Sequence, residues 1–153
     1  MRNPETLIAA AMLTCFVSPA LASANDAAAL APLHQFINDQ NKGDVKGAEA
    51  AFAPGAVIVD EFSPFRWRGK NLVQKWDADF GKMAKSAGIT SASLKDQEPT
   101  RITVDGHQAY AVVPAELHFL LKGKAETERG LLTVVTKKTT VGWKIADFTY
   151  SPE

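Results

Sequence analysis

The spacing of apolar positions changes along the chain, from a mostly helical period in the first half to a strand period in the second. From residue 30 to residue 37 apolar side chains recur at intervals of three and four, which is typical of an amphipathic helix. Gly43 is suited to end this helix, and Asp44 to open a short second helix over 45–52. The same spacing predicts a third helix over 71–86.

The other segments are rich in β-branched residues and are separated by short turns. Asp105-Gly106 is a strong hairpin signal, and Lys122-Gly123 indicates a second tight turn. Strands are expected at 56–62, 89–94, 100–104, 108–121, 126–138 and 143–150.

This order of elements predicts an α+β fold. A cone-shaped, curved and mostly antiparallel sheet should carry about three helices packed on its concave face. The wide end of such a cone is a natural pocket for a small molecule. The chain has 153 residues and no internal repeat or linker, so one domain is expected.

The N-terminus has the features of an export signal. Arg2 supplies a positive charge, and the apolar run over 7–17 is too short to span a bilayer. Small residues at 22–24 match the positions that a signal peptidase reads. We therefore predict a signal peptide over 1–24 that is removed, and a periplasmic or secreted protein.

Removal of this segment leaves a single mature domain over 25–153. Cleavage after Ala22 and retention of the segment as an N-terminal anchor helix are the alternatives. Cys15 is the only cysteine and lies in the removed segment. The mature chain should therefore form no disulfide and use no thiol chemistry.

Charge and spacing argue against several classes of partner. Lys plus Arg and Asp plus Glu number 17 each, so the basic excess of a nucleic-acid-binding protein is missing. No two histidines have the spacing of metal ligands, and no Gly-rich phosphate loop is present. Neither a metal nor a cofactor is expected.

Several segments, taken in order, resemble the nuclear-transport-factor-2-like superfamily, in particular its SnoaL-like and ketosteroid-isomerase-like branches. They are the amphipathic helix ending in Gly-Asp (36–44), Val-Ile-Val-Asp-Glu-Phe with the Pro, Trp and Gly that follow (57–76), Asp-Gly-His-Gln-Ala-Tyr (105–110), Glu-Arg-Gly before Leu-Leu-Thr-Val-Val (128–135), and Gly-Trp-Lys-Ile with Phe and Tyr (142–150). The resemblance covers nearly the whole mature chain and implies the conical fold. It does not imply one function, because this fold hosts enzymes, binding proteins and assembly modules.

The isomerase branch offers a direct comparison of chemistry. Asp60 matches the position of that family's general base, nine residues before Gly69. The family's two oxyanion-hole donors, a tyrosine and a protonated aspartate, correspond here to Phe36 and to Val134 or Val135. Loss of one such donor costs about a hundredfold or more in rate, so steroid isomerisation is not expected.

Asp60 is the main candidate for chemistry. Asp60 and Glu61 are neighbours on a predicted strand and should face opposite sides of the sheet, and the resemblance places Asp60 inward. A buried carboxylate with a raised pKa is suited to act as a general base. The alternative is a structural carboxylate that caps a helix or pairs with Arg66 or Arg68.

Two histidines are further candidates to assist Asp60. Glu116 and His118 share one face of the long predicted strand, and the opposite face is purely apolar. The pair should therefore lie on the more exposed face, unless a bulge switches the register. His34 lies on the first predicted helix.

Five aromatic residues are candidates to bind a ligand: Phe36, Phe65, Trp67, Trp76 and Tyr110. Phe65 and Trp67 lie in the predicted loop before the third helix, where they could rim the mouth of the pocket and favour a planar apolar molecule. Core packing is the alternative for each large aromatic residue.

Three functions remain open at this stage. The domain could bind a small hydrophobic molecule in an apolar cone that contains Asp60. It could be a lyase, isomerase or cyclase that uses Asp60 as its general base. It could also be an interaction module that forms a homodimer through the sheet.

Overall fold

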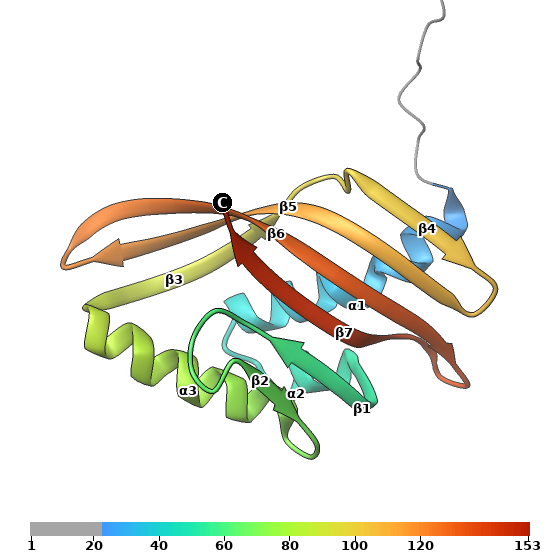
Figure 1. The fold of residues 1–153 in the computed structure, drawn as a ribbon, viewed down its shortest axis with the longest axis horizontal. Helices are drawn as coiled ribbons and strands as arrows, with labels where there is room; N and C mark the ends of the chain where they lie inside the picture. The colour runs from blue at the N-terminus through green and yellow to red at the C-terminus, as the bar shows by residue number, and fades with distance from the viewer. Residues whose placement is uncertain (1–22) are drawn as a thin grey trace, which may run out of the picture.

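The computed structural model describes residues 23–153 as one curled sheet with three helices (Figure 1). The predicted signal peptide therefore lies outside the described residues, apart from Ser23 and Ala24. Within the described part of the chain, no helix is long and apolar enough to cross a membrane.

The first helix, α1 (Ala24–Asn41), begins with a capping box. The Ser23 side chain accepts a hydrogen bond from the Asp26 amide at 3.2 Å, and the Asp26 carboxylate accepts one from the Ser23 amide at 2.8 Å. The helix thus starts ahead of the apolar pattern that begins at residue 30. The first turns are rich in alanine, which favours a helix without marking an apolar face.

The other two helices flank the first strand of the sheet. In α2 (Val45–Ala50) the Asp44 side chain caps the Gly47 amide at 3.0 Å, as the sequence predicted. The helix α3 (Leu72–Ala87) ends at Gly88, whose left-handed backbone has φ 77°.

Seven strands form the sheet, and all neighbours are antiparallel except β1 and β7, which are parallel. They are β1 (Phe52–Val59), β2 (Arg66–Arg68), β3 (Ile89–Asp96), β4 (Arg101–Asp105), β5 (Gln108–Leu121), β6 (Lys124–Thr139) and β7 (Gly142–Pro152). The order across the sheet is β2-β1-β7-β6-β5-β3, and β4 also pairs with β5. This confirms the predicted α+β fold.

The largest differences from the prediction lie around the first strand. β1 begins at Phe52, where a helix was expected, because this residue pairs with Ile145 of β7. The register then shifts before Val57, which accommodates the Pro-Gly step that pattern alone marks as a break. The predicted loop before α3 contains the short strand β2, in which Trp67 pairs with Ile58.

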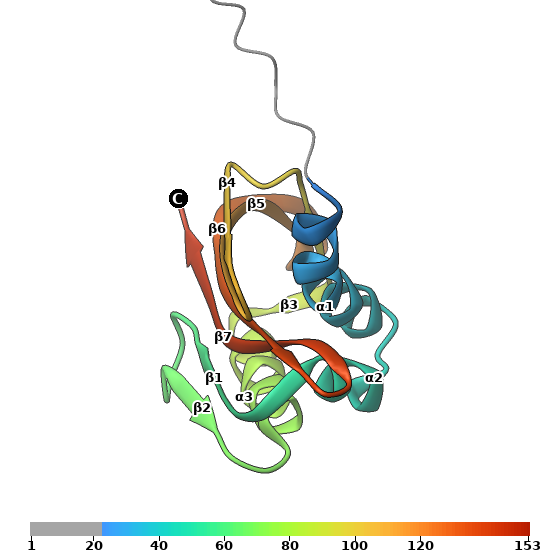
Figure 2. The same ribbon diagram turned by 90° about the vertical axis from the view of Figure 1, so that its right-hand side faces the viewer.

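The long strand β5 has the two faces that the sequence predicts. It pairs with β6 without interruption from Gln108 to Leu121, so no bulge switches its register. Its inward face begins with small, buried residues: Ala109, Ala111, Val113 and Ala115. The small side chains permit α1 to lie close along the concave side of the curled sheet, as Figure 2 shows.

Candidate ligand pocket

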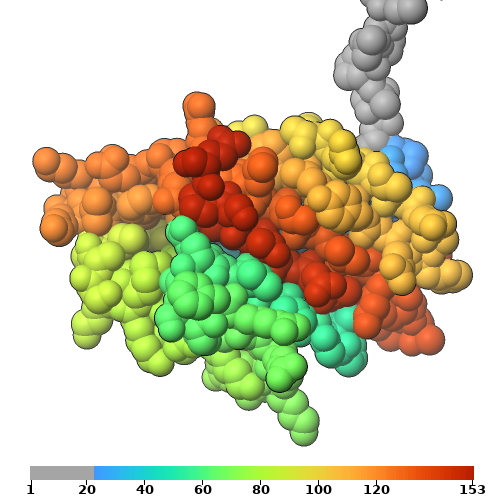
Figure 3. Space-filling model, in the orientation of Figure 1, coloured from blue at the N-terminus to red at the C-terminus, as the bar shows by residue number. Residues whose placement is uncertain are grey.

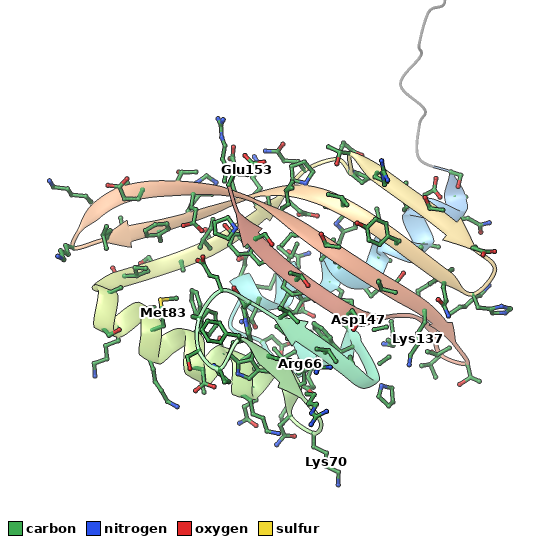
Figure 4. All side chains as sticks on the ribbon, viewed as in Figure 1. Arg66, Lys70, Met83, Lys137, Asp147 and Glu153 are labelled. Carbon is green, nitrogen blue, oxygen red and sulfur yellow. The ribbon has the colours of Figure 1, made fainter. Side chains whose placement is uncertain are left out.

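A cavity of about 240 Å³ lies in the wide part of the cone, beyond the alanines of β5. Its walls come from α1, α3, the loop after β1, and strands β3, β5, β6 and β7. In Figure 3 the surface is hollowed where α3, the loop after β1 and the β5–β6 hairpin meet. Figure 4 shows Met83, which lines the cavity, pointing from α3 toward the sheet, whereas Lys70 points into solvent.

Six aromatic side chains form half of the apolar lining: Phe36, Phe62, Trp76, Phe80, Phe119 and Phe148. The Phe36 ring lies 5.9 Å from the Trp76 ring and 5.1 Å from the Phe148 ring, in tilted and edge-to-face arrangements. Trp76 also stacks on Phe80 at 5.8 Å. Ring pairs in these arrangements stabilise each other by about 0.5–1.5 kcal/mol beyond the area they bury, so they stabilise the apolar wall.

Asp60 is the most deeply buried carboxylate of the lining, with 8% of its surface exposed. Its Oδ2 accepts a hydrogen bond from the Trp76 indole at 2.9 Å, and its Oδ1 accepts one from the Glu61 amide at 2.8 Å. Burial raises the pKa of Asp60, the two hydrogen bonds oppose that rise, and the negative charge of Glu128 adds to it. Among residues 23–153, no ion pair involves Asp60.

Glu61 also lines the pocket, which corrects the expectation that it faces away from Asp60. The alternation fails because β1 ends at Val59. The chain then turns, with the Asp60 amide donating to the Phe65 carbonyl at 3.2 Å. Burial raises the pKa of Glu61, and the charges of Glu128 and Asp60 raise it further.

Tyr150 and Glu128 form a second polar group of the lining. The Tyr150 hydroxyl donates to Glu128 Oε1 at 2.8 Å. Burial, together with this bond to a carboxylate, raises the pKa of the phenol, so Tyr150 remains a protonated donor. Gly130 makes room for the ring, because a Cβ at this position would lie 2.7 Å from a Tyr150 ring carbon.

Two amide side chains of α1 and the side chain of Ser93 are also part of the polar lining. Gln40 Nε2 donates to Asp77 Oδ1 at 3.0 Å, whereas Gln40 Oε1 is buried and has no hydrogen-bond partner among the described residues. Asn41 bonds to both backbone groups of Leu94, at 2.7 and 2.9 Å, and so fastens β3 to α1. The free polar atom in this part of the wall is therefore an acceptor.

A family model for the SnoaL-like domain matches residues 30–152, nearly the whole described chain. This chain belongs to the SnoaL-like domain family. None of the curated proteins compared matches it in sequence.

Solved structures of low sequence identity share the fold of this SnoaL-like domain. A nuclear transport factor 2-like superfamily protein from Salmonella enterica serovar Typhimurium LT2 is 19% identical, with a TM-score of 0.62 over 79% of this chain and 85% of that one. A ketosteroid isomerase-like protein from Erwinia carotovora atroseptica SCRI1043 is 16% identical, with a TM-score of 0.63 over 82% and 94%. An NTF2-like protein with a cystatin-like fold from Novosphingobium aromaticivorans is 12% identical, with a TM-score of 0.64 over 79% and 77%.

Two of the five aromatic residues predicted to bind a ligand, Phe36 and Trp76, line the pocket of the SnoaL-like domain. Phe65 is 58% exposed and lies outside the lining. Trp67 is buried in β2, where its indole donates to Asp79 at 3.0 Å and not toward the cavity. Tyr110 is 41% exposed on the outer face of β5, as the strand period requires.

The structure does not bring either histidine to Asp60. His34 pairs with Asp96 at 2.6 Å on the exposed side of α1. His118 lies 3.5 Å from Glu116 on the outer face of β5, and its Nδ1 lies 2.9 Å from the Thr127 hydroxyl. Neither histidine lines the pocket.

The two positions matched to oxyanion-hole donors lie in different places, and only one of them lines the pocket. Phe36 lines the pocket without a hydroxyl, and Val134 is buried in the core outside the lining. The neighbour of Val134, Val135, belongs to the opposite face of β6. The phenol that does reach the cavity comes from β7, as Tyr150.

Glu128 and Tyr150 line the pocket but were not among the predicted site residues. The alternation of inward and outward side chains along their strands could have indicated them. Glu128 shares the inward face of β6 with Gly130 and Leu132, and Tyr150 shares that of β7 with Phe148. A carboxylate or phenol in such a series is placed inside by the neighbours of its own strand.

Proposed function

We propose that this SnoaL-like domain binds a small hydrophobic molecule in the cone. The observation that carries the proposal is the aromatic cavity of about 240 Å³ with the buried carboxylate of Asp60 in its wall. A few fixed polar groups in a largely apolar, preformed cavity are typical of small-molecule sites.

Indole, a neutral planar molecule, is a suitable probe, and the three tryptophans of the chain provide the readout. The Trp76 indole donates to Asp60 inside the pocket, whereas Trp67 and Trp143 do not line it. In a titration of ¹⁵N-labelled protein, the Trp76 side-chain signal should shift and the other two should remain in place. An unchanged Trp76 signal at saturating indole would contradict the proposal.

A pair of alanine substitutions tests whether the cavity is the site. Ala92 lines the cavity at its exposed edge, and Ala92→Phe should obstruct it. Ala125, exposed on β6 and outside the lining, is the matched control. Indole binding should be lost in Ala92→Phe and retained in Ala125→Phe; equal binding by both variants would place the indole elsewhere.

Asp60 also supports a second candidate function, proton abstraction from a bound carbon acid in a lyase-, isomerase- or cyclase-type reaction. Burial raises its pKa, and the Trp76 indole holds one of its oxygens in a defined orientation. A ¹³C-detected titration of the Asp60 carboxyl group should give a pKa above the ordinary aspartate value of 3.8. A pKa at or below that value would exclude this role.

The third function considered from the sequence was a homodimer formed through the sheet, and the apolar face of β5 would serve only if the helices left it uncovered. That face, with Ala111 and Val113, is buried beneath the helices. A second copy of the chain could reach only the opposite face of the sheet.

A further inference from the structure

The charged residues that line the pocket are all acidic. Four carboxylates line the cavity: Asp60, Glu61, Asp77 and Glu128. No lysine, arginine or histidine is part of the lining. The inference below rests on the proposed function, because it concerns the chemical class of molecule that the same cavity takes.

The charge of these carboxylates is not balanced by neighbouring cations. None of the ion pairs within residues 23–153 includes a lining carboxylate. Asp60, Glu61 and Glu128 line the same cavity, and the negative charge of Glu128 contributes to the raised pKa of both Asp60 and Glu61. A carboxylate as buried as Asp60 usually has a cationic partner, because its desolvation is otherwise uncompensated.

Three side-chain donors of the lining are already engaged with carboxylates. The Trp76 indole donates to Asp60, the Tyr150 hydroxyl to Glu128, and the Gln40 amide to Asp77. In contrast, Gln40 Oε1 is a buried acceptor that lacks a donor in the described chain. Acceptor oxygens are therefore in excess over donors in the lining, and a ligand that brings donors can satisfy them.

The geometry favours an organic cation over a metal ion. Among the described residues, no group of three or more His, Cys, Asp or Glu side chains is arranged to hold a metal. The rest of the wall is aromatic, including the rings of Phe36, Trp76 and Phe148. Aromatic faces attract ammonium groups and bury apolar carbon, whereas a hard metal ion requires a closed shell of oxygen ligands.

We propose that the pocket binds a small aromatic or apolar amine in its protonated form. The ammonium group lies among Asp60, Glu61 and Glu128, and the carbon skeleton packs against the aromatic wall. The ammonium donates to carboxylate oxygens in charge-assisted hydrogen bonds. Its positive charge compensates Asp60, the buried carboxylate that residues 23–153 themselves leave without a cation.

Three compounds with one skeleton test this proposal: tryptamine, tryptophol and indoleacetate. They carry an ammonium group, a hydroxyl group and a carboxylate, respectively, on the same indole ring. An alkyl amine titrates at about 10, as lysine does, so tryptamine is cationic at neutral pH. By titration calorimetry we expect tryptamine to bind at least about tenfold more tightly than tryptophol, and indoleacetate to bind most weakly.

Charge-neutralising variants locate the effect. Asp60→Asn and Glu128→Gln keep the side-chain size and should reduce the preference for tryptamine over tryptophol by about tenfold. Glu116→Gln is the matched control. This substitution changes the net charge by the same amount, and Glu116 lies on the outer face of the sheet, away from the pocket. It should leave the preference unchanged.

The outcomes separate this inference from the proposed function. If tryptophol binds and tryptamine binds no more tightly, the inference is wrong and the binding function stands. If none of the three compounds binds, both are wrong. If Glu116→Gln reduces the preference as much as Asp60→Asn does, the effect is long-range attraction and the inference is again wrong. The comparison of compounds on the unaltered protein decides the matter even where a variant fails to fold.

Discussion

The same substitution, glycine to alanine, should have opposite effects at two positions of this domain. At Gly130 in β6 a Cβ would lie 2.7 Å from Cε2 of Tyr150 and 2.8 Å from the Ser151 carbonyl oxygen. The backbone oxygen cannot move without disturbing the pairing of β6 with β7. At Gly81 in the exposed part of α3 a Cβ would meet nothing within 4 Å.

The magnitudes follow from packing and from one hydrogen bond. Overpacking in a filled site costs about 1–3 kcal/mol. Displacement of the Tyr150 ring also breaks its 2.8 Å bond to Glu128. Together these effects should lower the free energy of unfolding of Gly130→Ala by about 2–4 kcal/mol. Gly81→Ala should raise it by about 0.5–1 kcal/mol, because alanine restricts the unfolded chain and favours the helix.

Equilibrium unfolding in urea measures both changes. The midpoints should move in opposite directions, while the dependence of the unfolding free energy on urea concentration stays the same. A Gly130→Ala variant as stable as the unaltered protein would refute the close packing of Tyr150 against β6. A Gly81→Ala variant that loses stability would refute the open environment assigned to that position.

Three further predictions concern the pH dependence, α1 and the N-terminus. Burial raises the pKa of Asp60 in the folded state, so the folded protein holds this proton to a higher pH than the unfolded chain does. The protein should therefore lose stability relative to Asp60→Asn as pH rises from 3.8 to the raised pKa, and above that pKa the difference should stay constant. Thermal unfolding measured across this pH range tests the expectation. Asn41→Ala removes both bonds to Leu94 and should cost about 1–2 kcal/mol, whereas Asn38→Ala, on the exposed side of the same helix, should cost less than about 0.5 kcal/mol. If the predicted signal peptide is removed after Ala24, N-terminal sequencing of the mature protein should begin at Asn25. A start at Ser23 would indicate the alternative cleavage after Ala22, which keeps the capping box of α1, and a start at Met1 would contradict removal of the segment.

Most of the sheet could be predicted because the side chains of its long strands alternate between a buried and an exposed face. The apolar parity of β5, from Ala109 to Phe119, indicated both the inward face and the exposure of Glu116 and His118. The prediction was least accurate for the segment from Phe52 to Trp67. There β1 contains a register shift, and β2 is three residues long, so neither shows a period that can be read locally. Both strands are defined by their partners and not by their own composition.

The pocket could be predicted only in part, because its polar groups meet through tertiary structure. Asp60 was recognised from its motif. The strand period could place Glu128 and Tyr150 on inward faces, but no local signal shows that these two residues and Gln40 of α1 meet at one cavity. The aromatic candidates show the same limit.

Trp67 and Trp76 are both buried or partly buried indoles near the loop after β1, and each donates to a carboxylate. The two indoles differ in the carboxylate that accepts their hydrogen bond. The partner of Trp76 is Asp60, at the end of β1 and inside the cone, whereas that of Trp67 is Asp79, which is not part of the lining. The charge on the cavity wall therefore depends on where β1 ends. One more residue of regular strand would turn Glu61 away from Asp60 and leave a single carboxylate there. The early end of β1 at Val59 brings both acids to the same wall, within the influence of Glu128, and this grouping is the reason to expect a cationic ligand.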